Sequence, residues 1–333
     1  MAEKSRNPAN NCGVCLSIII VNWNTAELLR QCLNSIYIHR ASGIMEVIVV
    51  DNNSKDRSVN MLRGEFPQVK LIINQENEGF AKANNKAIRI SKGSYVLLLN
   101  SDIEIIDDSI NKMLEFIEAN EKVGVVGCKL IDKNGNIQKS AAWFPSLATA
   151  IVGASLLPTF LARLFNIRRI PGQIYLSNEQ HEQTTFVDWV CGACLMIRRE
   201  TINDAGLMDE ALFMYGEEIE WCYRIKKMGW KVAHLPSAKV FHFRTGSSKS
   251  QSEIEIAYQR RVYAHRYIYA KFHSIYLARI HDFLLKFSAL IKLPVWWLLM
   301  QTATHKERAL SRFFIHKASL KSMYGLKKLI KSS

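Results

Sequence analysis

The stretch YVLLLNSDIEI, residues 95–105, decides the fold, because it joins an apolar run to a polar group at one point. The run VLLL has the composition of a β-strand covered on both faces, as in a parallel sheet between two layers of helices. Asn100, Ser101 and Asp102 follow it directly. Ligands of open parallel sheets bind outside the carboxyl ends of the strands, so an acid at this point also indicates where a polar ligand would bind.

Three similar runs precede this one along the chain: LSIIIV (16–21), MEVIVV (45–50) and VKLIIN (69–74). Helical patterns separate the runs, one of them extending from Phe80 to Ile90. Asn24 is expected to cap the helix after the first run, with Glu27 three positions later completing a capping box. Strands and helices in alternation predict the α/β class, with a parallel sheet and right-handed crossovers.

Polar residues also end the first two strands, as NWN (22–24) and DNNS (51–54). Each group alone has the composition of an ordinary turn or cap, but three such strand ends in one sheet favour a polar ligand. Asp51 can accept hydrogen bonds from a base or ribose, and Trp23 can stack on a ring. Asp102 can hold a divalent cation that neutralises a diphosphate. The glycine motifs of dinucleotide-binding and P-loop folds are absent, which argues against hydride transfer and ATP hydrolysis.

The segments SIIIVNWNTAELL, VIVVDNNSKDRS, NEGFAKANNKA and LLLNSD together resemble the nucleotide-binding half of family 2 glycosyltransferases. The rhamnosyltransferase-like members, which build bacterial surface polysaccharides, are the most similar. The likeness covers about residues 15–250 and implies the GT-A fold, with a Rossmann-like parallel or mixed sheet. It also implies an inverting, metal-dependent hexosyltransferase that moves a sugar, rhamnose being the first candidate, from a nucleotide-diphosphate donor. The implied acceptor is a hydroxyl of a growing, lipid-linked polysaccharide of the cell envelope.

The same resemblance implies roles for individual residues. It places the nucleotide base at Asp51 and the metal, Mg²⁺ or Mn²⁺, at Asp102. Asn100 stands where the family has the first acid of a DxD motif, so the metal is assigned to Asp102, and Asn100 is only a weak candidate for a supporting role. The donor, linked to dTDP or UDP, is expected to contact Val21, Trp23, Asp51, Asn77, Phe80 and Ser101.

A second group of acids lies in FMYGEEIEWCYR, residues 213–224, where a helix is expected to begin and Gly229 to end it. Acids favour helix N-termini through the helix dipole alone, so the group needs no catalytic explanation. The segment also resembles the family's acidic pair on the acceptor side, whose second acid is the catalytic base. This likeness assigns the base to Glu218, with Glu217 as the alternative. A Glu in place of the more usual Asp moves the carboxylate by about 1 Å, which matters for proton abstraction.

His242, in KVFHFRTGSS (239–248), is similar to the family's histidine that completes the metal site. Imidazole together with carboxylate and diphosphate oxygens suits Mn²⁺ or Mg²⁺. A histidine at a strand end is otherwise a structural residue, and we interpret His234 in that way. Gly246 and Ser247 would form a loop that closes on the diphosphate.

The positive charge of the chain is concentrated at its C-terminal end. Residues 251–333 hold 15 Lys and Arg against 4 Asp and Glu, a surplus of 11 in a net charge of +14. Basic and aromatic residues alternate there at helical spacing, which predicts a basic, mostly helical extension that associates with an anionic membrane surface. Nucleic-acid binding would explain the same charge, but no motif supports it, so no nucleic-acid partner is expected.

Two apolar segments, 146–162 and 283–300, are candidates for a membrane span. The first is short and contains a proline, and the second is interrupted by two lysines and a proline, whereas a span needs about 20 apolar residues. Segment 283–300 is therefore expected either to lie flat in a membrane interface or to form a buried core helix. The N-terminus lacks the apolar core of a secretory signal, so we expect a cytoplasmic protein, peripheral on the inner face of the cell membrane.

The expected organisation is a disordered segment 1–14, a catalytic domain 15–250 and a membrane-associating tail 251–333. The catalytic domain divides into a nucleotide-binding half, 15–130, and an acceptor half, 131–250. CGVC (12–15) and CGAC (191–194) have the spacing of redox or zinc sites, but neither opens a helix after a strand. Two other function classes stay open: a non-catalytic relative that binds sugar nucleotides or polysaccharides, and a basic nucleic-acid-binding protein.

Overall fold

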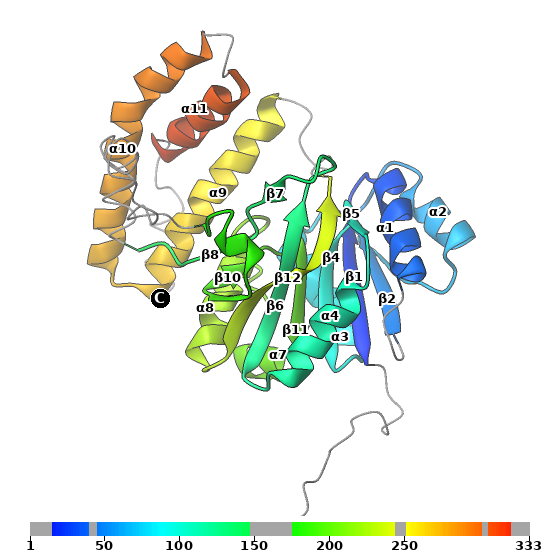
Figure 1. Ribbon diagram of the computed structural model, residues 1–333. Coiled ribbons are helices and arrows are strands. Elements are labelled where there is room, and N and C mark those ends of the chain that lie inside the picture. Colours follow the sequence, from blue (N-terminus) through cyan, green and yellow to red (C-terminus); the bar gives the residue numbers. More distant parts are fainter. Residues whose placement is uncertain (1–14, 40–44, 147–174, 244–250, 302–305, 321–333) are drawn as a thin grey trace, which may run out of the picture.

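A computed structural model of the 333-residue chain describes residues 15–39, 45–146, 175–243, 251–301 and 306–320. The expected disordered segment 1–14 lies outside these ranges, as do nearly all of the apolar segment 146–162 and the glycine-containing loop after His242. Figure 1 shows a central sheet with helices on both sides and a group of C-terminal helices next to it.

A mixed sheet forms the centre of the molecule, with the strand order β3-β2-β1-β4-β11-β6-β12-β5. The strands β1 to β4 are parallel to one another, β11 is antiparallel to both its neighbours, and β12 is parallel to β6. The strands in this order are β3 (Lys70–Ile73), β2 (Met45–Asp51), β1 (Leu16–Asn22), β4 (Tyr95–Asn100), β11 (Cys194–Arg198), β6 (Val123–Ile131), β12 (Lys231–His242) and β5 (Ile103–Ile105). The predicted α/β class with a parallel or mixed sheet is confirmed.

Short strands extend this sheet and build a second one. β7 (Ile137–Gln138) pairs with β6, and β9 (Thr185–Val187) pairs with β12. β8 (Ala141–Ala142) and β10 (Trp189–Val190) form a separate antiparallel pair, and a short 3₁₀ helix covers Gln180–Glu182.

Helices cover both faces of the sheet. Successive strand residues point to opposite faces, and because nearly all of them are apolar, both faces must be covered. Ile18 and Ile20 of β1 pack with one set of helices, whereas Ile19 packs with the other. The first set comprises α1 (Ala26–Ile38), α2 (Ser58–Glu65) and α4 (Ser109–Ala119). The second comprises α3 (Phe80–Ile90), α7 (Arg199–Ala205) and α8 (Glu217–Lys227), and α9 (Gln251–Phe272) adds to it. Burial on both faces explains the nearly continuous apolar runs in the sequence.

Three helices form the C-terminal region, as the sequence predicts: α9, α10 (Ile275–Met300) and α11 (Lys306–Leu320). Figure 1 shows them grouped on the opposite side of the molecule from α1 and α2. Among the described helices, α10 alone is long and apolar enough to cross a membrane, and most of its apolar residues are exposed. Two lysines and a proline made segment 283–300 a poor span in the sequence, but the helix begins eight residues earlier, at Ile275, and the whole of it meets the length and composition of a span. The alternative of a buried core helix is wrong.

The strand order reverses direction between β1 and β4, since β2 and β3 continue on one side of β1 while β4 lies on the other. Such a switch point leaves a crevice at the carboxyl ends of the two strands, where α/β proteins bind their ligands. Asn22 ends β1, and Ser101 and Asp102 follow β4, so the fold brings the predicted polar residues to this crevice.

Candidate active site

A continuous series of hydrogen bonds links the carboxyl ends of β4, β1 and β2. The Ser101 hydroxyl lies 2.8 Å from the Thr25 hydroxyl, which donates to Asn22 Oδ1 at 2.7 Å. Asn22 Nδ2 in turn donates to Asp51 Oδ1 at 2.9 Å. The network is buried or partly buried, which strengthens its bonds and fixes the three strand ends relative to one another.

The N-terminus of α1 differs from the expected capping box. The helix begins at Ala26, and the Ala26 N–H donates to Asp56 Oδ2 at 2.9 Å, so the cap comes from the loop after β2. Asn24 instead adopts a left-handed backbone with φ 55° and accepts the Lys55 N–H through its side chain. Contacts between neighbouring strand ends therefore replace the local cap that the sequence pattern favours.

A cavity of about 390 Å³ opens at the switch point and is called the smaller cavity below. Of the six residues expected to contact the donor, five line it: Val21, Trp23, Asn77, Phe80 and Ser101. Trp23 is 40% exposed, so its ring is accessible for stacking. Asp51 does not line the cavity, because it is fully buried and its oxygens accept from Asn22 Nδ2 and the Ser54 N–H. In this structure Asp51 therefore orders the loop rather than facing the cavity.

A second cavity of about 960 Å³, called the larger cavity, adjoins the first. It is lined by all four residues that the sequence assigns to catalysis and metal binding: Asp102, Glu217, Glu218 and His242. The two cavities share Phe80, Asn100, Asp102, Met214 and Tyr215 as lining residues. Asp102 consequently lies where the two cavities meet. A ligand that extends from one cavity into the other would pass this carboxylate.

Asp102 and His242 face each other across this junction, with Asp102 Oδ1 3.5 Å from His242 Nε2. The Gln138 amide is oriented by its Nε2, which donates to the His242 carbonyl at 2.7 Å, so its Oε1 accepts from His242 Nδ1 at 2.9 Å. A neutral imidazole with its proton on Nδ1 turns the Nε2 lone pair toward the carboxylate. Two opposed acceptors fit a cation between them, and diphosphate oxygens and water would supply the other ligands of Mg²⁺ or Mn²⁺.

The acidic pair begins α8, after a turn in which both Tyr215 (φ 74°) and Gly216 (φ 91°) are left-handed. Glu217 is buried, and its Oε2 has no hydrogen-bond partner within the part of the chain that the structure describes. Burial, followed by the charge of Glu218, raises the pKa of Glu217 well above its usual range. Glu218 is half-buried and accepts the Gly216 N–H at 3.1 Å.

Burial also raises the pKa of Glu218, but backbone N–H groups and the positive charge of Arg261 oppose this effect. Of the two acids, Glu218 thus has the surroundings that favour the ionised form. A general base must be ionised to accept a proton, so the geometry favours Glu218 over Glu217 for that role.

Helix α9 supplies residues of the site that the sequence analysis missed. Arg260 lines the smaller cavity and Arg261 the larger one, and their guanidinium carbons lie 4.1 Å and 4.4 Å from the ring centroids of Phe213 and Tyr215, respectively. The sequence pattern indicates this helix only as part of a membrane-associating tail. The available signal was two consecutive arginines, which basic residues elsewhere in the tail obscure.

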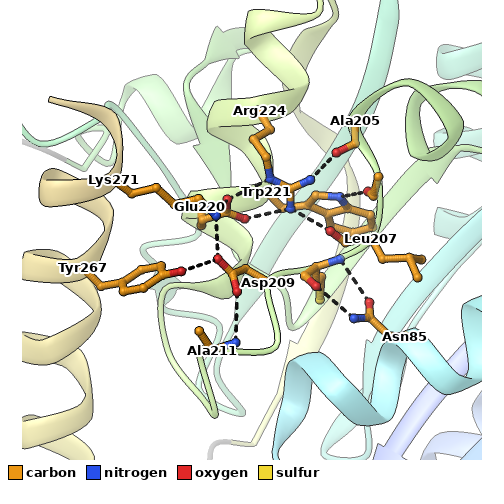
Figure 2. Close-up of polar contacts among 12 residues, drawn as sticks. Asn85, Ala205, Leu207, Asp209, Ala211, Glu220, Trp221, Arg224, Tyr267 and Lys271 are labelled. Carbon is orange, nitrogen blue, oxygen red and sulfur yellow. Dashed lines mark hydrogen bonds and ion pairs between the residues drawn. The ribbon is translucent and has the colours of Figure 1, made fainter. Parts of the chain in front are cut away.

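A partly buried polar network holds α9 against α8 and the loop before it, as Figure 2 shows. Asp209 Oδ2 accepts from the Tyr267 hydroxyl at 2.6 Å and from Lys271 Nζ at 2.5 Å. Lys271 also donates to Glu220 Oε1 at 2.8 Å, and Arg224 pairs with the same carboxylate. Glu220 is fully buried, so its charge requires these partners. The contacts fix the helix that carries Arg260 and Arg261.

His234 and the CGAC segment (191–194) are structural parts of the fold rather than metal sites in the described residues. His234 is a core residue, as expected, and burial lowers its pKa to about 4. Within the described ranges, no three His, Cys, Asp or Glu side chains gather as a metal cluster. The CGAC segment therefore gives no support to a zinc site.

Comparison with known proteins agrees with this geometry. Residues 17–205 match the family model described as "Glycosyl transferase family 2", which covers more than half of the chain. The chain belongs to glycosyl transferase family 2. It is a glycosyltransferase, and the resemblance found in its sequence is confirmed.

Two relatives of the glycosyltransferase are rhamnosyltransferases. The N-acetylglucosaminyl-diphospho-decaprenol L-rhamnosyltransferase of Mycobacterium tuberculosis is 26% identical over 245 residues, which are 70% of this chain and 77% of that protein. The rhamnosyltransferase WbbL of Escherichia coli is 25% identical over 241 residues, covering 70% and 85% of the two chains. Among solved structures, the mannosyltransferase PcManGT of Pyrobaculum calidifontis, with GDP-Man and Mn²⁺, superposes with a TM-score of 0.58 at 16% identity over 96% of this chain and 91% of that one. The expected GT-A fold is confirmed.

Proposed function

We propose that the glycosyltransferase moves a sugar, with rhamnose the first candidate, from a nucleotide-diphosphate donor to a hydroxyl of a lipid-linked saccharide, with inversion at the anomeric carbon. One observation carries this proposal: Asp102 lies at the junction of two cavities, and one of them contains the acidic pair. A nucleotide in the smaller cavity would place its diphosphate near Asp102 and its sugar toward the larger cavity.

Asp102 and His242 are the residues that would hold Mg²⁺ or Mn²⁺. The cation, when bound, offsets the charge that develops on the leaving nucleoside diphosphate. Gln138 keeps the His242 ring in the tautomer that the site requires. The 3.5 Å separation of Asp102 Oδ1 and His242 Nε2 supports this assignment.

Glu218 is the proposed base. It accepts the proton of the acceptor hydroxyl while that oxygen bonds to the anomeric carbon and the bond to the diphosphate oxygen breaks. The sugar is displaced once, from the face opposite the leaving group, so the configuration inverts and no enzyme nucleophile is needed. Glu217 stays the alternative base.

The identity of the partners rests on the relatives. The name of the mycobacterial relative specifies a rhamnose transfer and a diphospho-decaprenol acceptor, which supports a lipid-linked acceptor here. A dTDP-linked or UDP-linked donor is proposed on the sequence resemblance alone. An acceptor of this kind would be presented at the cytoplasmic face of a membrane, where we place the protein as a peripheral enzyme, with 15–250 as catalytic domain and 251–333 as tail.

Calorimetric titration with dTDP, UDP and their sugars, at fixed Mn²⁺ or Mg²⁺, tests the proposal. We expect one nucleotide to bind, and Asp102→Asn to weaken metal-dependent binding about 100-fold or more. Asp108→Asn is the matched control, because this acid is exposed and lies outside both cavities. Glu218→Gln should keep donor binding and lose transfer. Binding without transfer by the unmodified protein, with any acceptor, would instead support the non-catalytic alternative.

A further inference from the structure

The smaller cavity has an unusual charge distribution. Its described lining residues include one anion, Asp102, and one cation, Arg260, and the rest are neutral. A nucleoside diphosphate carries several negative charges, which the Asp102 carboxylate alone would repel. Arg260 is thus the only formal positive charge that the described wall of this cavity offers to such a ligand.

Arg260 is held in place without being neutralised. Its guanidinium carbon lies 4.1 Å from the centroid of the Phe213 ring, and the side chain is half-buried. No carboxylate among the described residues lies within ion-pair distance of it, whereas Lys271 on the same helix pairs with two acids. Stacking of a guanidinium on a ring fixes its plane and leaves its N–H groups at the edge available to an acceptor.

The backbone around Arg260 is rigidly positioned. About two and three turns further along α9, Tyr267 and Lys271 bond to Asp209, and Lys271 also bonds to Glu220 of α8. Between these points, Ala264 packs directly on Gly216. These contacts hold the helix that carries Arg260, and stacking on Phe213 holds its guanidinium.

We propose that Arg260 binds the diphosphate of the nucleotide donor, so that α9 is part of the donor site. The inference rests on the proposed function. Arginine recognises phosphate oxygens with two parallel N–H groups, which suits a site where the leaving group gains negative charge as the sugar departs. Arg260 is therefore assigned a role in holding the donor and in stabilising the departing diphosphate, separate from the role of Asp102.

Titration of UDP, UMP, dTDP and dTMP into the full-length protein at fixed Mg²⁺ tests this assignment. Arg260→Met should weaken the better nucleoside diphosphate about tenfold or more, since hydrogen bonds between charged groups typically contribute this much. The affinity for the matching monophosphate should change less than about twofold. Arg260→Lys keeps the positive charge but loses the paired N–H groups of the guanidinium. Its affinity for the nucleoside diphosphate should lie between that of the unmodified protein and that of Arg260→Met.

Arg279→Met is the matched control, because Arg279 lies on α10, is exposed and lines neither cavity. It should leave every affinity unchanged. Equal weakening of diphosphate and monophosphate by Arg260→Met, or no weakening, would overturn the assignment. A thermal midpoint for Arg260→Met well below that of the control, together with partial loss for every ligand, would show a structural role instead. If the unmodified protein binds none of the four nucleotides, the proposed function itself fails.

Discussion

Two adjacent glutamates in one turn of α8 have different surroundings, and the difference predicts a pH dependence. Burial raises the pKa of Glu218, so its ionised fraction falls at a higher pH than that of an exposed glutamate. If Glu218 is the base, the transfer rate will decline as pH falls through this raised pKa and will level off above it. A profile of kcat/KM against pH measures this decline, which is the acidic limb of the profile. Arg261→Gln should move the limb to higher pH, because the positive charge that favours the ionised form is lost; an unmoved limb would contradict the assignment.

Glu217 should reduce the stability of the protein at neutral and alkaline pH. Its folded-state pKa is raised, so folding favours the protonated form and ionisation lowers the free energy of unfolding as pH rises through that pKa. Glu217→Gln removes this cost, and we expect a gain on the order of 1 kcal/mol at pH 8. Denaturant unfolding at pH 8 and pH 5 checks it. The gain should shrink at pH 5, and a gain of the same size at both values would point to another cause.

The sequence pointed to those candidate site residues that lie in motifs, and it missed residues that line the same cavities from distant parts of the chain. Asp102, Glu218 and His242 each lie in a recognisable segment, and one cavity brings them together. Gln138 orients His242 across 104 positions of the chain, in a two-residue strand with no pattern of its own. Arg260 lies beyond the part of the chain that resembles the family. Only the folded chain shows that these side chains meet.

The turn before α8 approaches α9 closely at Gly216, which allows a matched comparison. Gly216 and Gly229 flank α8 and have nearly the same backbone, with φ 91° and 90°. A Cβ added at Gly216 would lie 2.7 Å from the Cβ of Ala264, whereas one added at Gly229 would meet nothing within 4 Å.

Gly229→Ala should cost about 1 kcal/mol of unfolding free energy through backbone strain alone, and transfer should continue. Gly216→Ala adds the collision, which displaces α9 or the acidic pair, so transfer should fall by up to about 100-fold. Unfolding curves and initial rates of both variants give the result. Equal rates in the two variants would show that the contact with α9 has no part in catalysis.

Regular elements were predictable from the sequence because their periodicity is local. The first four strands and the helix Phe80–Ile90 lie where the apolar patterns place them. The cap of α1 was predicted wrongly because its acceptor, Asp56, belongs to a different loop 30 residues away. The role of α9 as a cavity wall also depends on contacts with distant segments, which a helical pattern does not reveal.

At the scale of the whole molecule, the C-terminal region presents an exposed apolar surface on α10. Phe283 and Phe287 of α10 are 64% and 48% exposed and stack on each other. Exposed aromatic residues in a basic region are typical of attachment to an anionic membrane interface. The charge and the exposed face support the tail assignment that the sequence suggested.

Replacing both Phe283 and Phe287 with Asn should weaken binding to phosphatidylglycerol vesicles about tenfold or more, since each buried Phe contributes roughly 1.5–3 kcal/mol. Phe186→Asn on β9 is the control, because that ring is similarly exposed and lies outside the tail. Co-sedimentation with vesicles measures the change. Protein that stays with membranes after an alkaline carbonate wash would indicate a spanning helix rather than a peripheral one.

The close approach of α9 to the turn before α8 also bears on how relatives of this enzyme diverge. Residues 213, 215 and 216 contact residues 260, 261 and 264, across more than forty positions of the chain. A substitution on one side removes a stacking partner or fills space that the other side occupies. In a family alignment these two groups should therefore vary together, with a larger residue at 216 accompanied by a smaller one at 264. Independent variation at these positions would show that the contact is peculiar to this chain.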